Sequence, residues 1–158
     1  MALTFEEISV YLRCGDGLGD DLKRRVAELS AEAPIKGRGI FLRDGDVFFL
    51  CGTIGSSFDR WHRQLSVKSA ADALIAQAIG TAAVEKVMDG LEDEIRSTLS
   101  QDEKLKPRRS PGYGKMNIGL NREIIERLDA AKRIGVSFTD SMTLLPSKSV
   151  TAVCEVEK

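Results

Sequence analysis

The stretch Gly39-Ile40-Phe41-Leu42-Arg43-Asp44-Gly45-Asp46-Val47-Phe48-Phe49-Leu50-Cys51 decides the fold class. Two runs of β-branched and aromatic residues, 39–42 and 47–53, flank Asp44-Gly45-Asp46, a turn signal that predicts a β-hairpin. The second run is continuous rather than alternating, which is typical of a strand that is covered on both faces. We therefore expect this strand to lie inside a sheet.

Apolar residues at helical spacing predict helices over about 22–34, 70–99 and 121–134, and the chain is also expected to turn helical from about Phe58. The predicted apolar face of the second comprises Leu74, Ala78, Ala82, Leu91 and Ile95, widened by Val84, Val87 and Met88. Gly80 and Gly90 interrupt this helix, and close packing is one reason to expect glycine there, since each costs about 1 kcal/mol relative to alanine. The third helix should turn Ile124, Ile125, Leu128 and Ala131 inward and end at Gly135.

The end of the chain alternates in polarity, with Val150, Ala152, Cys154 and Val156 on one face, which predicts a half-buried strand. Residues 52–57 and 100–110 are interpreted as loops, and the glycines of the first would let backbone approach a ligand. Strands and helices interleave without a βαβ repeat. We expect an α+β fold, a mainly antiparallel sheet flanked by helices, in one domain spanning residues 1–158.

The overall charge balance gives no reason to expect a polyanionic partner. The chain has 23 basic and 24 acidic residues, a formal net charge of -1, so neither nucleic acid nor an anionic membrane is expected to bind. No signal peptide or membrane-spanning apolar run is found. Cys14, Cys51 and Cys154 fit small buried residues in a reducing compartment, which predicts a cytoplasmic protein.

Residues for self-contained catalysis are missing from the sequence. His62, beside Trp61, is interpreted as a surface or helix-packing residue. No nucleophile motif and no metal-ligand spacing occurs. The segment Gly15–Gly19 lacks a preceding strand and a lysine, which favours a turn and helix lead-in over a phosphate loop. We expect no catalytic and no metal-binding residue, and a binding module or one half of a reaction centre.

One motif remains, Arg108-Arg109-Ser110-Pro111-Gly112-Tyr113-Gly114. Pro111 and Gly112 favour a turn whose backbone N–H and C=O groups stay free to meet a ligand. The arginines offer bidentate donors for a carboxylate or phosphate, and Tyr113 offers a flat apolar face with a polar tip. Taken alone, the pattern also fits an ordinary Pro-Gly turn with solvated arginines.

The pattern Arg-x-x-Pro-Gly-Tyr, starting at Arg108, resembles the fingerprint of the reactivation domain of cobalamin-dependent methionine synthase. Blocks 134–141 and 145–152 follow in the family's order, and the helix over 73–96 resembles the family helix before the motif. The similarity covers residues 47–156, and its first part is closest to short stand-alone relatives. Residues 1–46 are only weakly similar.

The resemblance implies a function in repairing oxidised cobalamin. Such a domain presents S-adenosylmethionine above the corrin of a partner protein while flavodoxin or another reductant supplies an electron. It implies that Arg108 pairs with the methionyl carboxylate and that Glu85 lies near the cofactor. Backbone of Ser110, Pro111, Gly112 and Tyr113 would contact adenine and ribose. Thr139, Asp140 and Ser141 would order the loop under the site or contribute to it.

Two features depart from the family pattern. No residue matches an aspartate near the start of the family domain, and Cys154 stands where a tyrosine is expected. The leading hypothesis is an activation subunit for a methionine synthase that lacks this domain. Alternatives are an accessory to another corrinoid methyltransferase, a non-catalytic scaffold that kept the fold, and an independent small-molecule methyltransferase. The absence of a glycine-rich loop after a strand weighs against the last.

Overall fold

The predicted hairpin forms around Gly45. In the computed structural model, which describes residues 1–13 and 19–158, β1 (Arg38–Asp44) pairs antiparallel with β2 (Val47–Thr53), and Asp44 lies opposite Val47. Gly45 has a φ of 61°, a left-handed conformation that costs glycine little because it lacks Cβ. The hairpin prediction is confirmed.

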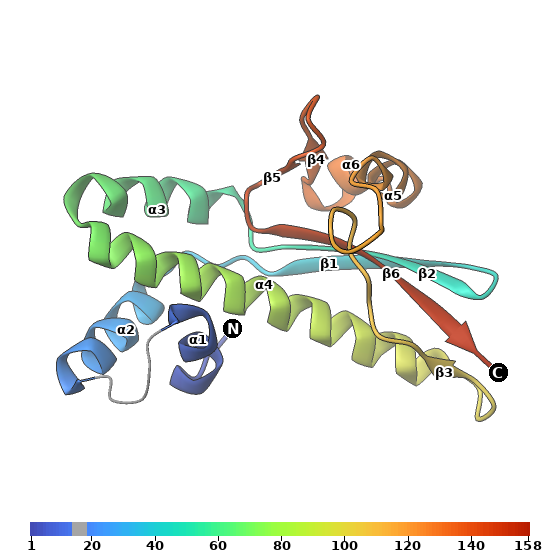
Figure 1. Ribbon diagram of the computed structural model, residues 1–158, viewed down its shortest axis with the longest axis horizontal. Coiled ribbons are helices and arrows are strands. Elements are labelled where there is room, and N and C mark those ends of the chain that lie inside the picture. Colours follow the sequence, from blue (N-terminus) through green and yellow to red (C-terminus); the bar gives the residue numbers. More distant parts are fainter. Residues whose placement is uncertain (14–18) are drawn as a thin grey trace.

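The sheet is completed by segments late in the chain (Figure 1). β6 (Ser149–Glu157) pairs with β2 on the side away from β1, and the short β3 (Lys104–Leu105) pairs with β6. The order is β1-β2-β6-β3 with every pair antiparallel. β4 (Ser137–Phe138) and β5 (Leu144–Leu145) form a separate small hairpin. The α+β prediction is therefore correct, although β3 lies in a segment that was expected to be a loop.

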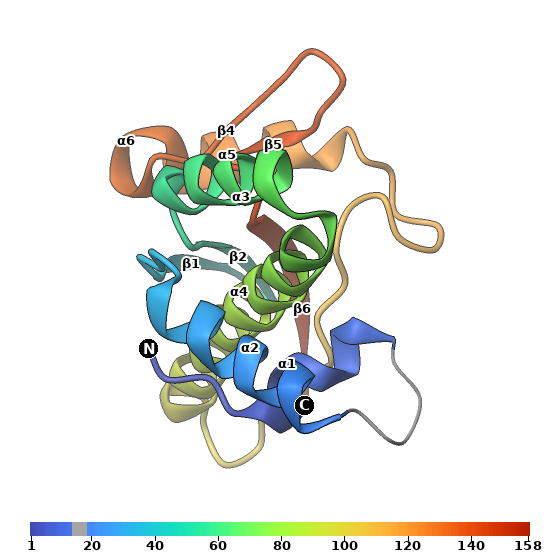
Figure 2. The same cartoon turned by 90° about the vertical axis from the view of Figure 1, so that its left-hand side faces the viewer.

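Helices cover both faces of the sheet. They are α1 (Phe5–Leu12), α2 (Asp20–Glu32), α3 (Ser56–Lys68), α4 (Ala70–Thr98), α5 (Leu120–Leu128) and α6 (Ala130–Ile134). α4 crosses one face and carries α1, α2 and α3 against its own sides, as the view in Figure 2 shows. α5 and α6 pack on the opposite face.

The side chains of β2 alternate between these two layers. Phe48 and Leu50 pack under α4 with Met88. Cys51 points the other way, into a cluster with Ile124 of α5. Since both faces are covered, a continuous apolar run is what this strand requires. β6 is covered in the same way, so it is more buried than the half-buried strand that its alternation predicted.

The glycines show where helices approach closely. A Cβ on Gly52 would lie 2.8 Å from Sδ of Met88, and one on Gly80 would lie 2.6 Å from the Phe58 ring. Gly52 and Thr53 belong to β2 and Ser56 begins α3, so the predicted loop shrinks to two residues. The absence of a side chain at Gly52 therefore allows α4 to pack closely, and does not provide the predicted approach for a ligand. Close packing explains Gly80 but not Gly90, whose Cβ would meet nothing within 4 Å.

Two predicted inward-facing residues point to solvent. Leu74 is 72% exposed, while Ile75 and Ile79 occupy the core instead. The helix over 121–134 breaks at Asp129, whose φ of 51° is left-handed, and this break buries Ala130 in place of Ala131. Gly135, with a φ of 73°, ends the second piece as predicted.

Cys51 and Cys154 are buried and unpaired, as expected. Cys14 lies outside the described residues, and so do residues 15–18 of the turn predicted at 15–19. Gly19 caps α2. His62 bonds the carbonyl of Ala73 and stacks on Phe58, so it is a helix-packing residue. In the described ranges, no helix combines the length and apolarity that crossing a membrane requires.

Candidate functional site

The motif arginines are positioned by a short run of backbone paired with β6. Lys106 N donates to Glu155 O at 2.9 Å, and Arg109 exchanges bonds of 2.9 and 2.8 Å with Val153. Successive side chains of an extended segment point to opposite sides. Arg109 consequently forms an exposed ion pair with Glu155 at 2.6 Å, and Arg108 turns toward α4.

Arg108 is held by three carboxylates on one face of α4. Its Nη2 donates to Oε2 of Glu85. Its Nη1 lies 2.7 Å from Oδ1 of Asp89 and 3.1 Å from Oε2 of Glu92. Glu85, Asp89 and Glu92 are spaced by four and three residues, so the helix presents them side by side. The motif arginine and the helix glutamate are thus direct partners.

This cluster is partly withdrawn from water. The Arg108 side chain is 19% exposed and that of Glu92 is 11% exposed. Burial by itself lowers the pKa of Arg108, but the hydrogen bonds to Asp89 and Glu85 outweigh it and hold that pKa above its ordinary value. The arginine is a fixed cation. The carboxylates outnumber it, although Arg96 adds a longer contact of 3.6 Å to Glu92.

The loop after Arg109 is a self-bonded turn. Gly112 has a φ of 89°, and its N–H donates to the carbonyl of Met116 at 2.9 Å. The N–H of Tyr113 donates to the carbonyl of Ser110 at 3.3 Å. The expectation that these N–H groups stay free for a ligand is therefore wrong, because the turn consumes them. Exposed side chains such as Tyr113 are left to face the solvent.

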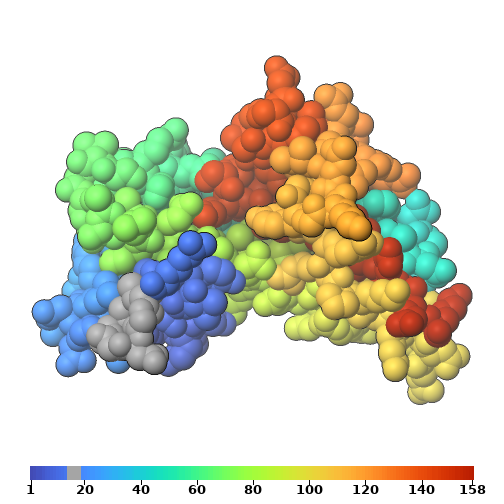
Figure 3. Space-filling view, in the orientation of Figure 1, coloured from blue at the N-terminus to red at the C-terminus, as the bar shows by residue number. Residues whose placement is uncertain are grey.

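An open cleft of about 890 Å³ runs between this loop and α1. Figure 3 shows the loop (orange) and the N-terminal helix (blue) on either side of a hollow above α4. The lining is Tyr11, Thr81, Glu85, Arg108, Arg109, Ser110, Tyr113, Gly114, Lys115, Met116, Asn117, Leu120 and Val150. Carboxylate, guanidinium and aromatic groups therefore converge on one concave surface.

The structure brings most of the predicted site residues together. Glu85, Arg108, Ser110 and Tyr113 all line the cleft. Pro111 is buried beneath the turn, and Gly112 shapes the turn without lining the cleft. Thr139 and Ser141 bond each other at 2.9 Å within the β4–β5 turn and do not line the cleft either.

Sequence reasoning missed Tyr11, which comes from a helix that was not predicted. The signal was present: Thr4 and Glu7 form a capping box, with Glu7 N donating to Thr4 Oγ1 at 3.1 Å. That pattern marks a helix start seven residues before Tyr11. Asp89 was also missed, and its position four residues after Glu85 on a predicted helix would have indicated it.

Of the residues that the structure describes, no three His, Cys, Asp or Glu side chains are grouped to hold a metal ion. Burial, followed by the charge of Glu92, raises the pKa of the Cys154 thiol to about 12. The buried Cys154 thiol is therefore a packing group.

Comparisons with known proteins identify the fold. No family model and no curated protein matches the sequence. A crystal structure of the MetH reactivation domain bound to AdoHcy superposes with a TM-score of 0.67 at 14% identity, covering 98% of this chain and 70% of that chain. The chain therefore has the fold of the MetH reactivation domain.

Proposed function

We propose that this chain is an S-adenosylmethionine-binding activation subunit that supports reductive remethylation of the cobalamin of a methionine synthase lacking this domain. The observation that carries the proposal is the meeting of Arg108 and Glu85 at an open cleft. The fold supports it, because the MetH reactivation domain that shares this fold binds AdoHcy.

The charges of the cleft suit an amino-acid zwitterion with an added positive charge. A guanidinium carries five N–H donors, and the bonds from Arg108 to Glu85, Asp89 and Glu92 leave donors for a ligand carboxylate. The Glu85 carboxylate can in turn meet an ammonium or sulfonium group. The cleft of about 890 Å³ lies within the usual range for a ligand of this size.

The aromatic groups complete the fit. Tyr11 and Tyr113 come from opposite walls of the cleft and offer flat faces to an adenine ring. Bound S-adenosylmethionine would supply the methyl group, and the protein would orient it by these contacts without a nucleophile of its own. The methyl acceptor would be cobalamin carried by the partner, with an electron from flavodoxin or another reductant.

Exposed apolar groups beside the cleft provide a surface for that partner. Tyr113 is 78% exposed and Ile118 is 47% exposed. Exposed apolar side chains that lie together on one loop are typical of a surface that another protein covers. We therefore propose that the corrin-bearing protein binds at the loop that carries Tyr113 and Ile118.

Calorimetric titration tests the ligand. S-adenosylmethionine should bind the full chain, Arg108→Gln should weaken binding at least tenfold, about 1.4 kcal/mol, and Arg127→Gln should leave it within about threefold. Arg127 is the matched control because it is an arginine that pairs with Asp44 and Glu123 and does not line the cleft. An absence of heat both with and without a cobalamin-loaded methionine synthase would refute the proposal.

One observation favours a second candidate, a scaffold that kept the fold. Three protein carboxylates already bind Arg108, as they would if the arginine only tied the loop to α4. In that case Arg108→Gln lowers stability, no S-adenosylmethionine binds, and pull-down from native lysate recovers no cobalamin protein. Recovery of a corrinoid methyltransferase other than methionine synthase would instead redirect the proposal to that partner.

A further inference from the structure

A second hollow, separate from the cleft, lies between the N-terminal segment, α1 and α2. It measures about 470 Å³ and is lined by Met1, Ala2, Leu3, Phe5, Ile8, Lys23, Val26, Ala27, Ser30, Ala31, Ala33 and Ile35. None of these residues lines the cleft. The groove is therefore a separate site from the cleft, although α1 contributes residues to both.

The groove exists because one face of α2 carries small side chains. Lys23, Ala27, Ser30 and Ala31 follow helical spacing, so they share that face. Alanine and serine are too short to fill the gap to α1. Ile8 and Val26 are almost fully buried and supply an apolar floor.

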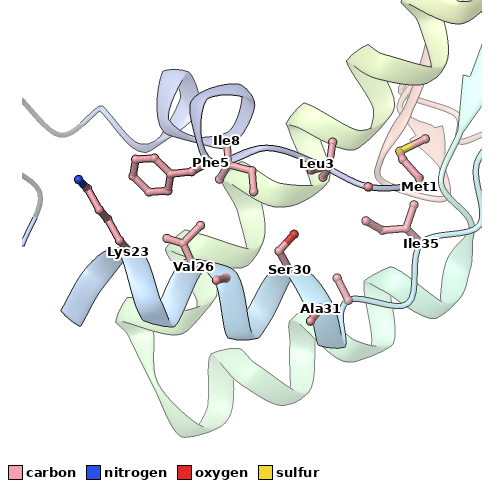
Figure 4. Close-up of a pocket in the computed structure, with 12 residues that line it drawn as sticks. Met1, Leu3, Phe5, Ile8, Lys23, Val26, Ser30, Ala31 and Ile35 are labelled. Atoms are coloured by element: carbon pink, nitrogen blue, oxygen red, sulfur yellow. The ribbon is translucent and has the colours of Figure 1, made fainter. Parts of the chain in front are cut away.

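The groove is elongated and polar at one end. Figure 4 shows Lys23 at one end and Met1 with Ile35 at the other, while Leu3 and Phe5 face α2 across the gap. From Lys23 to Ala33 the helical rise gives a length of roughly 15 Å. An apolar trough of this shape fits an extended alkyl chain better than a flat polar ring.

The charges along the groove select the head group. Lys23 is the charged residue of the lining, which contains no aspartate or glutamate. In the described parts of the chain the Lys23 ammonium has no ion pair, and its closest recorded partner is the Phe5 ring, 5.8 Å from the Nζ atom. An ammonium at the mouth of an apolar trough attracts an anionic head and repels a cationic one.

We propose that this groove binds a linear aliphatic carboxylate, with the alkyl chain along α2 and the carboxylate at Lys23. Removing the methylenes from water is favourable, so the alkyl chain supplies most of the affinity and the lysine supplies orientation. Ser30, midway along the groove, leaves room for the chain and adds no charge.

Titration of the full chain with decanoate below its micellar concentration tests the proposal. We expect saturable binding of one molecule per chain. Lys23→Gln should weaken it about threefold to tenfold, since the lysine is solvent-accessible. Arg24→Gln removes the same charge from the next position of α2, outside the groove, and should change it less than twofold.

A variant that fills the groove distinguishes specific binding in the groove from non-specific hydrophobic binding elsewhere on the protein. Ala27→Leu combined with Ala31→Leu should abolish decanoate binding while circular dichroism stays unchanged. Ala71→Leu adds the same side chain at an exposed position of α4 and should bind normally. Decanol and decyltrimethylammonium should both bind more weakly than decanoate.

Three results would overturn the proposal. One is equal binding by the filled and unfilled proteins. Another is uptake that occurs only with micelles or phospholipid vesicles and not with monomeric decanoate. The third is a change of oligomeric state in the filled variant, which would assign the groove to a second copy of the chain.

Discussion

Glu85 and Arg108 pair directly although 23 residues separate them in the sequence, with Oε2 of the glutamate accepting from Nη2 of the arginine. The glutamate lies midway along α4, and the arginine lies on the segment that follows β3 and runs beside β6. Their contact joins the helix layer to the sheet edge at the floor of the cleft. Variants of this pair should therefore test both the stability of the fold and the proposed ligand site.

Removing the arginine should destabilise the protein. Arg108→Leu leaves Glu92, whose side chain is 11% exposed, without its closest cationic partner. We expect the free energy of unfolding to fall by about 1–3 kcal/mol. Arg109→Leu removes an exposed pair and should change it by less than about 0.5 kcal/mol. Urea denaturation measures both, and equal effects would show that the Arg108 cluster carries no special stability.

The two glycines of α4 should respond in opposite directions to alanine. Gly80→Ala places a Cβ 2.6 Å from the Phe58 ring, which must shift, and should cost about 1–3 kcal/mol. Gly90→Ala meets nothing within 4 Å and should stabilise the helix by about 0.5–1 kcal/mol. Thermal unfolding of both variants checks the sign. A stabilised Gly80→Ala protein would contradict the packing described for α3 on α4.

Tyr11 should contribute to cofactor affinity from the wall of the cleft that α1 provides. If the proposed ligand binds there, Tyr11→Ala should weaken S-adenosylmethionine binding about threefold to tenfold, since an aromatic contact contributes about 0.5–1.5 kcal/mol. Tyr11→Phe keeps the ring and should retain most of it. Val10→Ala, at the neighbouring exposed position, is the control. Unchanged affinity in Tyr11→Ala would remove α1 from the site while leaving the proposed function standing.

Glu103 should make stability depend on acidity. Hydrogen bonds from the Arg43 guanidinium and from the backbone N–H of Ser100 lower the pKa of Glu103 from 4.5 to about 2. A lowered acid pKa stabilises the fold above pH 4.5, and that stabilisation is lost as the pH falls toward 2. Melting temperatures of wild type and Glu103→Gln should differ at pH 7 and converge toward pH 2. Asp102→Asn is the control, and a constant difference for Glu103→Gln would contradict the assignment.

The elements that sequence predicted best are those with an unambiguous period. The hairpin at Gly45 allows one arrangement, and the alternation of β6 located that strand, although it predicted only one buried face. The N-terminal part of α4 has no unambiguous period, because Leu74 lies on a different side of the helix from Ile75 and Ile79. Only the packing of neighbouring helices determines which side is buried. The helix break at Asp129 was also missed, because the apolar spacing continues across it; aspartate is a weak helix former that tolerates a left-handed φ, which was the available signal.

The site was predictable where a short motif carried it and not where distant segments meet. Arg108, Ser110 and Tyr113 follow from one stretch of sequence, and Glu85 from the helix before it. The encirclement of Arg108 by three carboxylates depends on the rotation of α4. The hydrogen bonds of Gly112 and Tyr113 within the turn depend on the return of the chain at Met116. Neither set of contacts follows from a regular residue spacing, so neither could be predicted from the sequence.

The position of β6 also sets an order of events during synthesis. It lies between β2 and β3, and every partner it has is made before it. Arg108 and the whole of α4 leave the ribosome earlier, yet Arg109 can bridge to Val153 only once residues 149–157 have emerged. Until then one side of β2 presents unpaired backbone groups. A nascent chain halted before residue 149 should therefore be a client for chaperones rather than a partly competent protein.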